Sequence, residues 1–392
     1  MPSLRCIATT AGSLKRMRTA LFLLLMGAPL LSGCGSGKFF VPPCQDTNSC
    51  GGGGSTAYSS FAYVGNQTVG TIAAFPLPTA AFTSVSGTSY NLGTPVSALA
   101  ATPTGTFLYV AITQGSILVY SIGANGVLTQ GNNGSAVAST LLPTYMTVDP
   151  SGNWLFVVSS SSHQLLMFQI NTTNGILTQN SQSPILLASG NPTQIYVTPN
   201  DQNLYVGLGA GGLDAFAFNS TTGALSNHLH YAPLSSAGVA DNAIAADNNS
   251  AFLFVGETGS NLRVFTIGTG GALTEISGSP FQTQLGPKAI VVDPTNAYVY
   301  VANSTAGVIT GYTLGAGGAL TPLSSSPFTT GSVPVAMSLD STGKYLLAIS
   351  NGGNPDLQIF SFDATHPGAL DTVATAATGT DPAGAISLSV VP

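Results

Sequence analysis

Acidic and basic side chains are scarce in this 392-residue chain, since only 6% of its residues are charged. Three of them, Asp241, Glu257 and Lys288, fall in one stretch of the sequence. A carboxylate can act as general base on a water molecule that attacks a lactone carbonyl, and an ammonium group can stabilise the oxyanion that forms. These residues are therefore candidate catalytic groups of a hydrolase. The alternative interpretation is a solvent-exposed ion pair on the protein surface, with the second acidic residue left unpaired.

Other reactive residue types occur in patterns that favour structure over chemistry. His228 and His230 would face the same side of a strand and could share a metal ion, but no third ligand is evident, so two exposed strand residues are the simpler interpretation. Ser341 and Lys344 have the spacing of a Ser/Lys pair but lie in a predicted turn. Aspartates that precede turns at a fixed place in the sequence are interpreted as structural: Asp149, Asp247, Asp293 and Asp340.

The N-terminal segment has the features of an export signal. Basic residues at positions 15, 16 and 18 precede the apolar run TALFLLLMGAPLL, which is too short to span a bilayer comfortably. The run ends in LSGC at residues 31–34, which resembles the lipobox of bacterial lipoproteins. That resemblance implies cleavage before Cys34 and lipidation of this residue. An ordinary signal peptide with a chance cysteine is the alternative, and either Met1 or Met17 could be the start.

We expect three segments: a lipoprotein signal peptide at residues 1–33, a flexible Gly/Ser-rich tether at 34–56, and a folded domain at 57–392. Cys44 and Cys50 lie in the tether, and an exported location would allow them to form a disulfide bond. Without residues 1–33, four Lys/Arg remain against fourteen Asp/Glu, a net charge of 4 − 14 = −10. This balance argues against nucleic acid or anionic lipid as a partner, because both require clustered cations.

The folded domain is built from a repeat of about 47 residues. Motifs such as FLYV, WLFV and YVYV recur at successive steps of 46, 47, 49, 49, 46 and 47 residues, and each unit divides into four alternating strands separated by turns. The residues that mark the second strand of each unit are Val64, Val110, Val157, Val206, Val255, Val301 and Ala348. Four-stranded units at this period predict a β-propeller rather than an open β-solenoid, whose coils are shorter.

The two ends of the domain predict how the ring closes. The first unit begins at its second strand, and the C-terminal residues 385–389, AISLS, align with the first strand AMSLD of the last unit, residues 336–340. The C-terminal strand would thus complete the first blade and leave no radial edge unpaired. We therefore predict an all-β fold: a seven-bladed β-propeller of four-stranded antiparallel blades, closed by the C-terminal strand.

In a propeller, the loops between second and third strands lie at one mouth with the segments that enter each first strand. Loops on a rigid scaffold often carry function, so their polar residues are candidates for a binding site. The predicted ligand-binding residues are Asn66, His163, Gln194, Asn242, Asn303 and Asn351. Three further candidates at this mouth are Gln114, Asp356 and Asp381.

The segments YVYVAN, DPSGNWLFV and GYTLGAGGALTPLSSSPF look like the repeats of the seven-bladed lactonase-like propellers, also called YVTN-repeat proteins. The resemblance covers residues 57–392 and implies a family that includes 6-phosphogluconolactonases, which hydrolyse a sugar lactone. Family members with lactonase character tend to carry an Arg-Gln near a Pro-His-x-His run and an Asp-Leu-Gly-x-Asp segment. Neither motif is present, so no catalytic residue is carried over.

Phosphate recognition usually requires several cations or a helix N-terminus. Beyond residue 33 the chain has one arginine, Arg263, on a predicted third strand where its stem would cover apolar surface. A neutral lactone is therefore a better candidate substrate than a phosphorylated one.

These observations lead to two hypotheses of different classes. The first is a lipid-anchored module of the bacterial cell envelope that binds a small sugar-like ligand, a glycan or an envelope protein at the mouth. The alternative is a hydrolase of a sugar lactone. We expect a monomer without a cofactor, although Glu257, Asn66 and Asn303 could offer oxygen ligands to calcium. Gly35 after Cys34 favours the outer membrane, because an aspartate there retains many lipoproteins at the inner one.

Overall fold

The computed structural model describes residues 58–78, 87–131, 136–138, 142–188, 190–234, 239–352, 355–379 and 384–392. The chain divides into two compact units, residues 1–41 and 42–392, and all described residues belong to the second. The predicted signal peptide and tether, with Cys34, Cys44 and Cys50, lie outside the described residues, as does Asp381. No helix in the described part of the chain is both long and apolar enough to cross a membrane.

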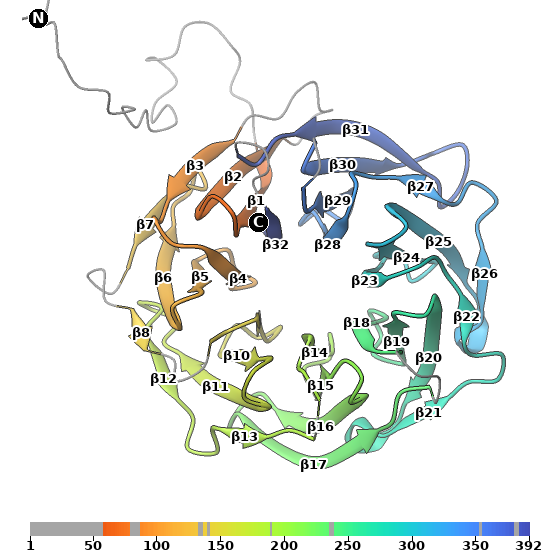
Figure 1. Ribbon diagram of the computed structural model, residues 1–392, viewed down its shortest axis with the longest axis horizontal. Helices are drawn as coiled ribbons and strands as arrows, with labels where there is room; N and C mark the ends of the chain where they lie inside the picture. Colours follow the sequence, from red (N-terminus) through yellow and green to blue (C-terminus); the bar gives the residue numbers. More distant parts are fainter. Residues whose placement is uncertain are drawn as a thin grey trace, which may run out of the picture. The chain divides into compact units, whose positions relative to one another are not determined.

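The described residues form seven antiparallel sheets arranged as the blades of a ring (Figure 1). From the inside outwards, blade one contains β32 (Ala385–Val391), β1 (Tyr58–Asn66), β2 (Thr71–Pro78) and β3 (Thr88–Asn91). Blade two contains β4 (Val96–Ala101), β5 (Phe107–Ile112), β6 (Ser116–Ile122), β7 (Leu128–Gln130) and β8 (Val137–Ala138). Blade three contains β9 (Tyr145–Val148), β10 (Trp154–Ser159), β11 (Gln164–Ile170), β12 (Leu177–Gln179) and β13 (Ile185–Leu186).

Blade four contains β14 (Gln194–Val197), β15 (Asn203–Gly207), β16 (Leu213–Asn219) and β17 (Ala224–Tyr231). Blade five contains β18 (Asp241–Ala246), β19 (Phe252–Glu257), β20 (Asn261–Ile267), β21 (Leu273–Glu275) and β22 (Phe281–Gln282). Blade six contains β23 (Pro287–Val292), β24 (Tyr298–Asn303), β25 (Val308–Leu314), β26 (Leu320–Pro322) and β27 (Phe328–Thr329). Blade seven contains β28 (Pro334–Leu339), β29 (Tyr345–Ser350), β30 (Leu357–Phe362) and β31 (Leu370–Ala376). Two short 3-10 helices, η2 (Thr269–Gly271) and η3 (Ala316–Gly318), precede β21 and β26.

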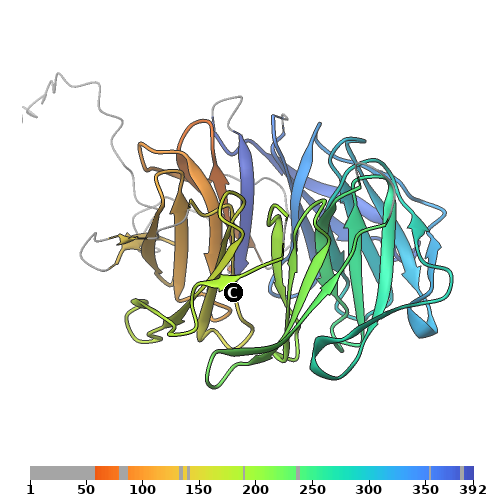
Figure 2. The ribbon, with the colours of Figure 1, turned by 60° about the horizontal axis from the view of Figure 1, so that its bottom comes forward.

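The C-terminal strand closes the ring, as predicted from the sequence. β32 pairs antiparallel with β1, and Leu388 lies opposite Val64. The innermost strands of neighbouring blades contact one another all the way round, in the order β4, β9, β14, β18, β23, β28, β32 and back to β4. Figure 2 shows the blades side by side, with their strands running from one end of the ring to the other. We call the end at which the second strands finish and the first strands begin the mouth.

The hydrophobic core lies between blades. Second strands such as β5 and β10 are buried along their whole length because both faces of a blade are covered by its neighbours. The buried clusters accordingly combine residues of two blades, for example Tyr109 and Val119 of blade two with Leu155 and Phe168 of blade three. Polar residues that occur in this region must therefore find partners within or between blades.

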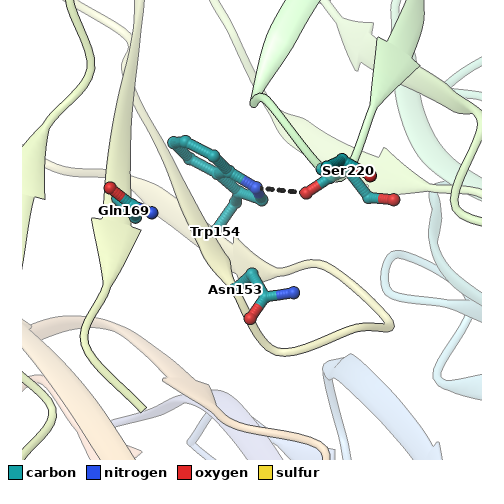
Figure 3. A pocket seen from close by; sticks show the side chains of 5 residues that line it. Asn153, Trp154, Gln169 and Ser220 are labelled. Carbon is teal, nitrogen blue, oxygen red and sulfur yellow. Dashed lines mark hydrogen bonds between the residues drawn. The ribbon is translucent and has the colours of Figure 1, made fainter.

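In four blades, a recurring contact joins the blade to the next one at the end opposite the mouth. The hydroxyl group of a second-strand tyrosine donates to the carbonyl of the glycine that opens the Gly-x-Leu turn of the next blade: Tyr63 to Gly126 at 2.8 Å, Tyr109 to Gly175 at 3.1 Å, Tyr205 to Gly271 at 3.2 Å and Tyr300 to Gly368 at 2.9 Å. Blade three has Phe156 at this place, and Trp154 Nε1 donates instead to Ser220 O at 2.7 Å (Figure 3). The repeated Gly-x-Leu is therefore a junction between blades.

The aspartates that precede turns have the structural role that their fixed position indicated. Asp149 Oδ1 accepts the backbone N–H of Trp154 at 2.7 Å, and Asp247 Oδ1 accepts that of Phe252 at 2.7 Å. Each carboxylate thus bridges a turn and fixes the start of the second strand.

Candidate functional site

Two of the three predicted catalytic residues come together at the mouth of blade five. Asp241 begins β18, Glu257 ends β19, and the two residues lie directly opposite each other in the antiparallel pair. Residues paired in this way project from the same face of a sheet. Glu257 is fully buried and Asp241 is 1% exposed, so the two carboxyl groups meet away from bulk water.

Arg263 on β20 supplies the cation of this site. Its guanidinium forms a two-point ion pair with Glu275, Nη2 to Oε2 at 2.7 Å and Nε to Oε1 at 3.2 Å, and Nη1 lies 3.5 Å from Glu257 Oε1. Nη1 also donates to the carbonyl of Ala232 in blade four at 3.1 Å. Sequence reasoning concerned only the stem of Arg263 and did not predict these contacts of its guanidinium, which also lies 4.7 Å from the centre of the Phe265 ring.

The remaining contacts of Glu257 hold its carboxylate in place. Oε1 accepts the backbone N–H of Leu234 at 3.2 Å, and Oε2 accepts Asn261 Nδ2 at 3.4 Å. Each oxygen thus has a fixed polar neighbour, and the Arg263 guanidinium adds an ion pair. A carboxylate oriented in this way is preorganised for interaction with a proton donor.

Asp241 is the side chain with the unusual protonation behaviour. Burial and, to a smaller extent, repulsion from Glu257 raise the pKa of Asp241 to about 7, although the positive charge of Arg263 opposes both effects. The two carboxyl groups also share a hydrogen bond, while Asp241 Oδ1 is buried without a hydrogen-bond partner among the described residues. Asp241 is therefore partly protonated near neutral pH, a property suited to acid–base chemistry.

Lys288 does not join the acid pair. It lies half-buried near the start of β23, where burial lowers its pKa, and its ammonium group makes no ion pair or hydrogen bond with any described residue. The cation in contact with Glu257 is Arg263, a residue that sequence reasoning had not assigned to the site. The alternation of side chains along a strand could have indicated it. Arg263 pairs with Val255, and Val255 and Glu257 are two residues apart on β19, so Arg263 projects from the same face as Glu257.

Three of the predicted ligand-binding residues are occupied by contacts within the protein. Asn66 Oδ1 accepts the Thr378 hydroxyl at 2.8 Å, and Asn303 Oδ1 accepts the Thr283 hydroxyl at 3.0 Å. Both asparagines are fully buried. Gln194 joins blade four to blade five, because its Oε1 accepts the backbone N–H of Ile244 at 2.8 Å. These carboxamide groups therefore stabilise the propeller by hydrogen bonds to other segments of the chain.

The other three predicted ligand-binding residues are not held by side-chain hydrogen bonds of this kind. The side chains of His163, Asn242 and Asn351 are half-buried and make no hydrogen bond with any described residue. Asn242 is the residue after Asp241 at the start of β18. Gln114 is exposed, whereas Asp356 is buried and accepts the Thr378 N–H at 3.0 Å.

Comparison with known families identifies the fold. The family model of the seven-bladed β-propeller lactonases matches residues 56–197 and 188–385. The chain belongs to this family. No curated protein matches this lactonase-family propeller.

Solved structures show the same fold at low sequence identity. A candidate 6-phosphogluconolactonase from Bacteroides fragilis is 19% identical, with a TM-score of 0.67 over 85% of this chain and 98% of that one. A second, from Bacteroides uniformis, is 16% identical with a TM-score of 0.70 over 85% and 99% of the two chains. The periplasmic gluconolactonase PpgL of Pseudomonas aeruginosa is 18% identical, with a TM-score of 0.65 over 85% and 99%.

Neither a metal-binding cluster nor the cavity found in this lactonase-family propeller extends the site at the acid pair. In the described part of the chain, no three His, Cys, Asp or Glu side chains are grouped to hold one metal ion. A cavity of about 310 Å³ lies at the opposite end, between blades three and four, where Gln169 and Ser220 flank Trp154 (Figure 3). This cavity adjoins the blade junction and is separate from the mouth.

Proposed function

We propose that this lactonase-family propeller hydrolyses a sugar lactone at the acid pair Asp241–Glu257. The observation that carries the proposal is a carboxyl group with a pKa of about 7 that shares a hydrogen bond with a second carboxyl group, beside a guanidinium group. Acid–base catalysis is most effective when the pKa of the catalytic group is near the working pH. Family membership and the candidate gluconolactonases among the structural relatives support the class of reaction.

The pair can divide the two proton transfers of lactone hydrolysis between its members. Glu257 accepts a proton from water as the water oxygen bonds to the lactone carbonyl carbon. When the ring C–O bond breaks, Asp241 donates its proton to the departing ring oxygen, and the product is a hydroxy acid. The proton on Glu257 then returns to Asp241 through their shared hydrogen bond, which restores the starting state.

A neutral lactone suits this site better than a phosphorylated one. The guanidinium of Arg263 is already paired with Glu275 and Glu257. Of the two lysines in the described residues, Lys344 follows β28 at the end opposite the mouth, so Lys288 is the cation left to meet a phosphate at the mouth. The free carboxamide of Asn242 can bind sugar hydroxyl groups, as neutral polar ligands require.

Base-uptake titration at fixed pH tests the proposal. The purified protein is offered neutral and phosphorylated sugar lactones, and the initial rate is compared with spontaneous hydrolysis. We expect Glu257→Gln to lose about 10²- to 10⁴-fold of the rate, the usual contribution of a general base. Asp356→Asn is the matched control, because it alters another buried acid at the mouth and should keep the wild-type rate. Equal loss in the control would reject Glu257 as the base.

Ligand binding without turnover is the second candidate, favoured by the burial of both acids and by the unpaired side chains of His163, Asn242 and Asn351. Calorimetric titration that detects a sugar or glycan, in a protein that hydrolyses no lactone, would select it. We further propose that the lipobox-like sequence tethers the protein to the bacterial cell envelope. Mass spectrometry of the N-terminal peptide tests this, since lipidation of Cys34 adds acyl mass.

A further inference from the structure

A second buried carboxylate lies in blade four, between two histidines. Asp214 on β16 is fully buried, and His230 on β17 lies directly opposite it. The register of this strand pair shifts between Ala215 and Ala217, where β17 carries an extra residue opposite Phe216. His228 lies in this bulge and stacks on Phe216, with ring centres 4.4 Å apart. Both imidazoles are therefore held on the face of the blade from which Asp214 projects.

Each histidine uses one ring nitrogen to contact the same carboxylate. His228 Nε2 lies 3.0 Å from Asp214 Oδ2, and His230 Nδ1 lies 2.8 Å from Oδ1. The backbone N–H of Ala188 in blade three donates to Oδ2 at 2.8 Å. An ionised carboxylate only accepts hydrogen bonds, so both imidazole nitrogens that touch it are donors. In neutral imidazoles this leaves lone pairs on Nδ1 of His228 and Nε2 of His230.

These two nitrogens have no partner among the described residues, and the side chains are 40% and 41% exposed. In metal sites, a ligating histidine usually donates its other ring N–H to a carboxylate, which fixes the tautomer and makes the free nitrogen a better ligand. Asp214 gives this orientation to two imidazoles at once. No Lys or Arg side chain within the described ranges pairs with Asp214, so its negative charge is left to attract a cation.

We infer that His228 and His230 bind one divalent transition-metal ion of the class that prefers imidazole, Zn²⁺, Ni²⁺ or Cu²⁺, with Asp214 orienting both rings. The ion has two protein ligands, and water completes its coordination. Asp214 is assigned to the two rings and not to the ion, because no three His, Cys, Asp or Glu side chains of the described residues are grouped to hold one metal ion. The site lies on β16 and β17 of blade four, and its side chains are not those of the acid pair in blade five.

Calorimetric titration and Cu²⁺ electron paramagnetic resonance test the inference on the full chain with its cysteines alkylated. We expect one ion per chain and hyperfine coupling to two imidazole nitrogens. His228→Asn and His230→Asn should each weaken binding at least tenfold and leave one coupled nitrogen. Asp214→Asn should weaken it about 10- to 100-fold, the usual effect of removing a carboxylate behind a metal ligand.

His366→Asn is the matched control, because His366 Nδ1 also contacts a carboxylate, Asp363, at 2.8 Å but has no second histidine partner. Affinity in this control should equal that of the wild type. Absence of saturable binding up to about millimolar ion, or unchanged affinity in both His228→Asn and His230→Asn, would overturn the inference. Since both histidines are half-exposed, these two variants can carry the test even if Asp214→Asn does not fold.

Discussion

The blade junction at Gly223 offers a sharp test of how the propeller is held together. Gly223 opens the Gly-x-Leu turn of blade four with φ +72°, and a Cβ atom there would lie 2.4 Å from the ring of Trp154. Trp154 is 4% exposed, and its indole N–H is held by Ser220 O at 2.7 Å. The indole therefore cannot move aside without breaking that hydrogen bond. Replacement of Gly223 by alanine must push the two blades apart or tilt the ring.

The expected loss of stability for Gly223→Ala has three sources. A left-handed alanine costs about 1–2 kcal/mol, overpacking against the buried indole ring costs about 1–3 kcal/mol, and a weakened buried hydrogen bond costs about 1 kcal/mol. Gly317→Ala isolates the first source, because Gly317 has φ +76° and its Cβ would meet no atom within 4 Å. The two variants should thus differ by about 2–4 kcal/mol in the free energy of unfolding.

Urea unfolding followed by tryptophan fluorescence measures this difference directly. Trp154 is the single tryptophan of the chain, so its emission reports the junction itself. Gly223→Ala should also shift the emission of the folded protein, whereas Gly317→Ala should leave it unchanged. Equal unfolding midpoints for the two variants would refute the role of the glycine–tryptophan contact.

Three further predictions concern buried polar groups. Arg263→Met should lower the free energy of unfolding by about 3–5 kcal/mol, since it leaves the carboxylates of Glu257 and Glu275 without their cation; chemical denaturation checks this, and a change under 1 kcal/mol would contradict it. Because the pKa of Asp241 is raised in the folded state, folded protein keeps a proton on this residue that the unfolded chain releases above about pH 4. The free energy of unfolding should therefore fall as pH rises from about 4 to 7, by at most about 1.4 kcal/mol per pH unit. Asp241→Asn should remove this part of the slope in denaturation curves measured across that range, and an unchanged slope would count against it. Tyr300→Phe should cost about 1–2 kcal/mol in the same assay, because Gly368 O loses its buried donor at 2.9 Å.

The architecture was predictable because the information that specifies it is local and repeated. Strand alternation, turn residues and a steady period determine the blades, and the match between residues 385–389 and 336–340 determines how the ring closes. The breaks in the fourth strands were not predicted. In blade five, for example, β21 and β22 pair separately with β20 and are divided by a segment that contains Pro280, which cannot donate to a sheet ladder.

The candidate site was predictable only in part, because its contacts join residues far apart in the chain. Asp241 and Glu257 could be placed together since both stand at the mouth of one blade. Asn66 and Asn303 occupy the same position in their repeats as Glu257, but threonines of distant segments fill their hydrogen bonds. The reach of Arg263 to both Glu257 and Glu275 depends on strand register and side-chain packing, which strand periodicity alone does not determine.

The most direct test of the central proposal is the turnover of neutral sugar lactones by the wild-type protein and by Asp241→Asn, measured by base uptake from about pH 5 to 9. If Asp241 is the proton donor, wild-type turnover falls as pH rises through about 7, and Asp241→Asn loses at least about 10²-fold at every pH while the protein stays folded. Wild-type turnover that Asp241→Asn retains in full, or the absence of any turnover by folded wild-type protein, would contradict the assignment of the acid pair as the site of catalysis.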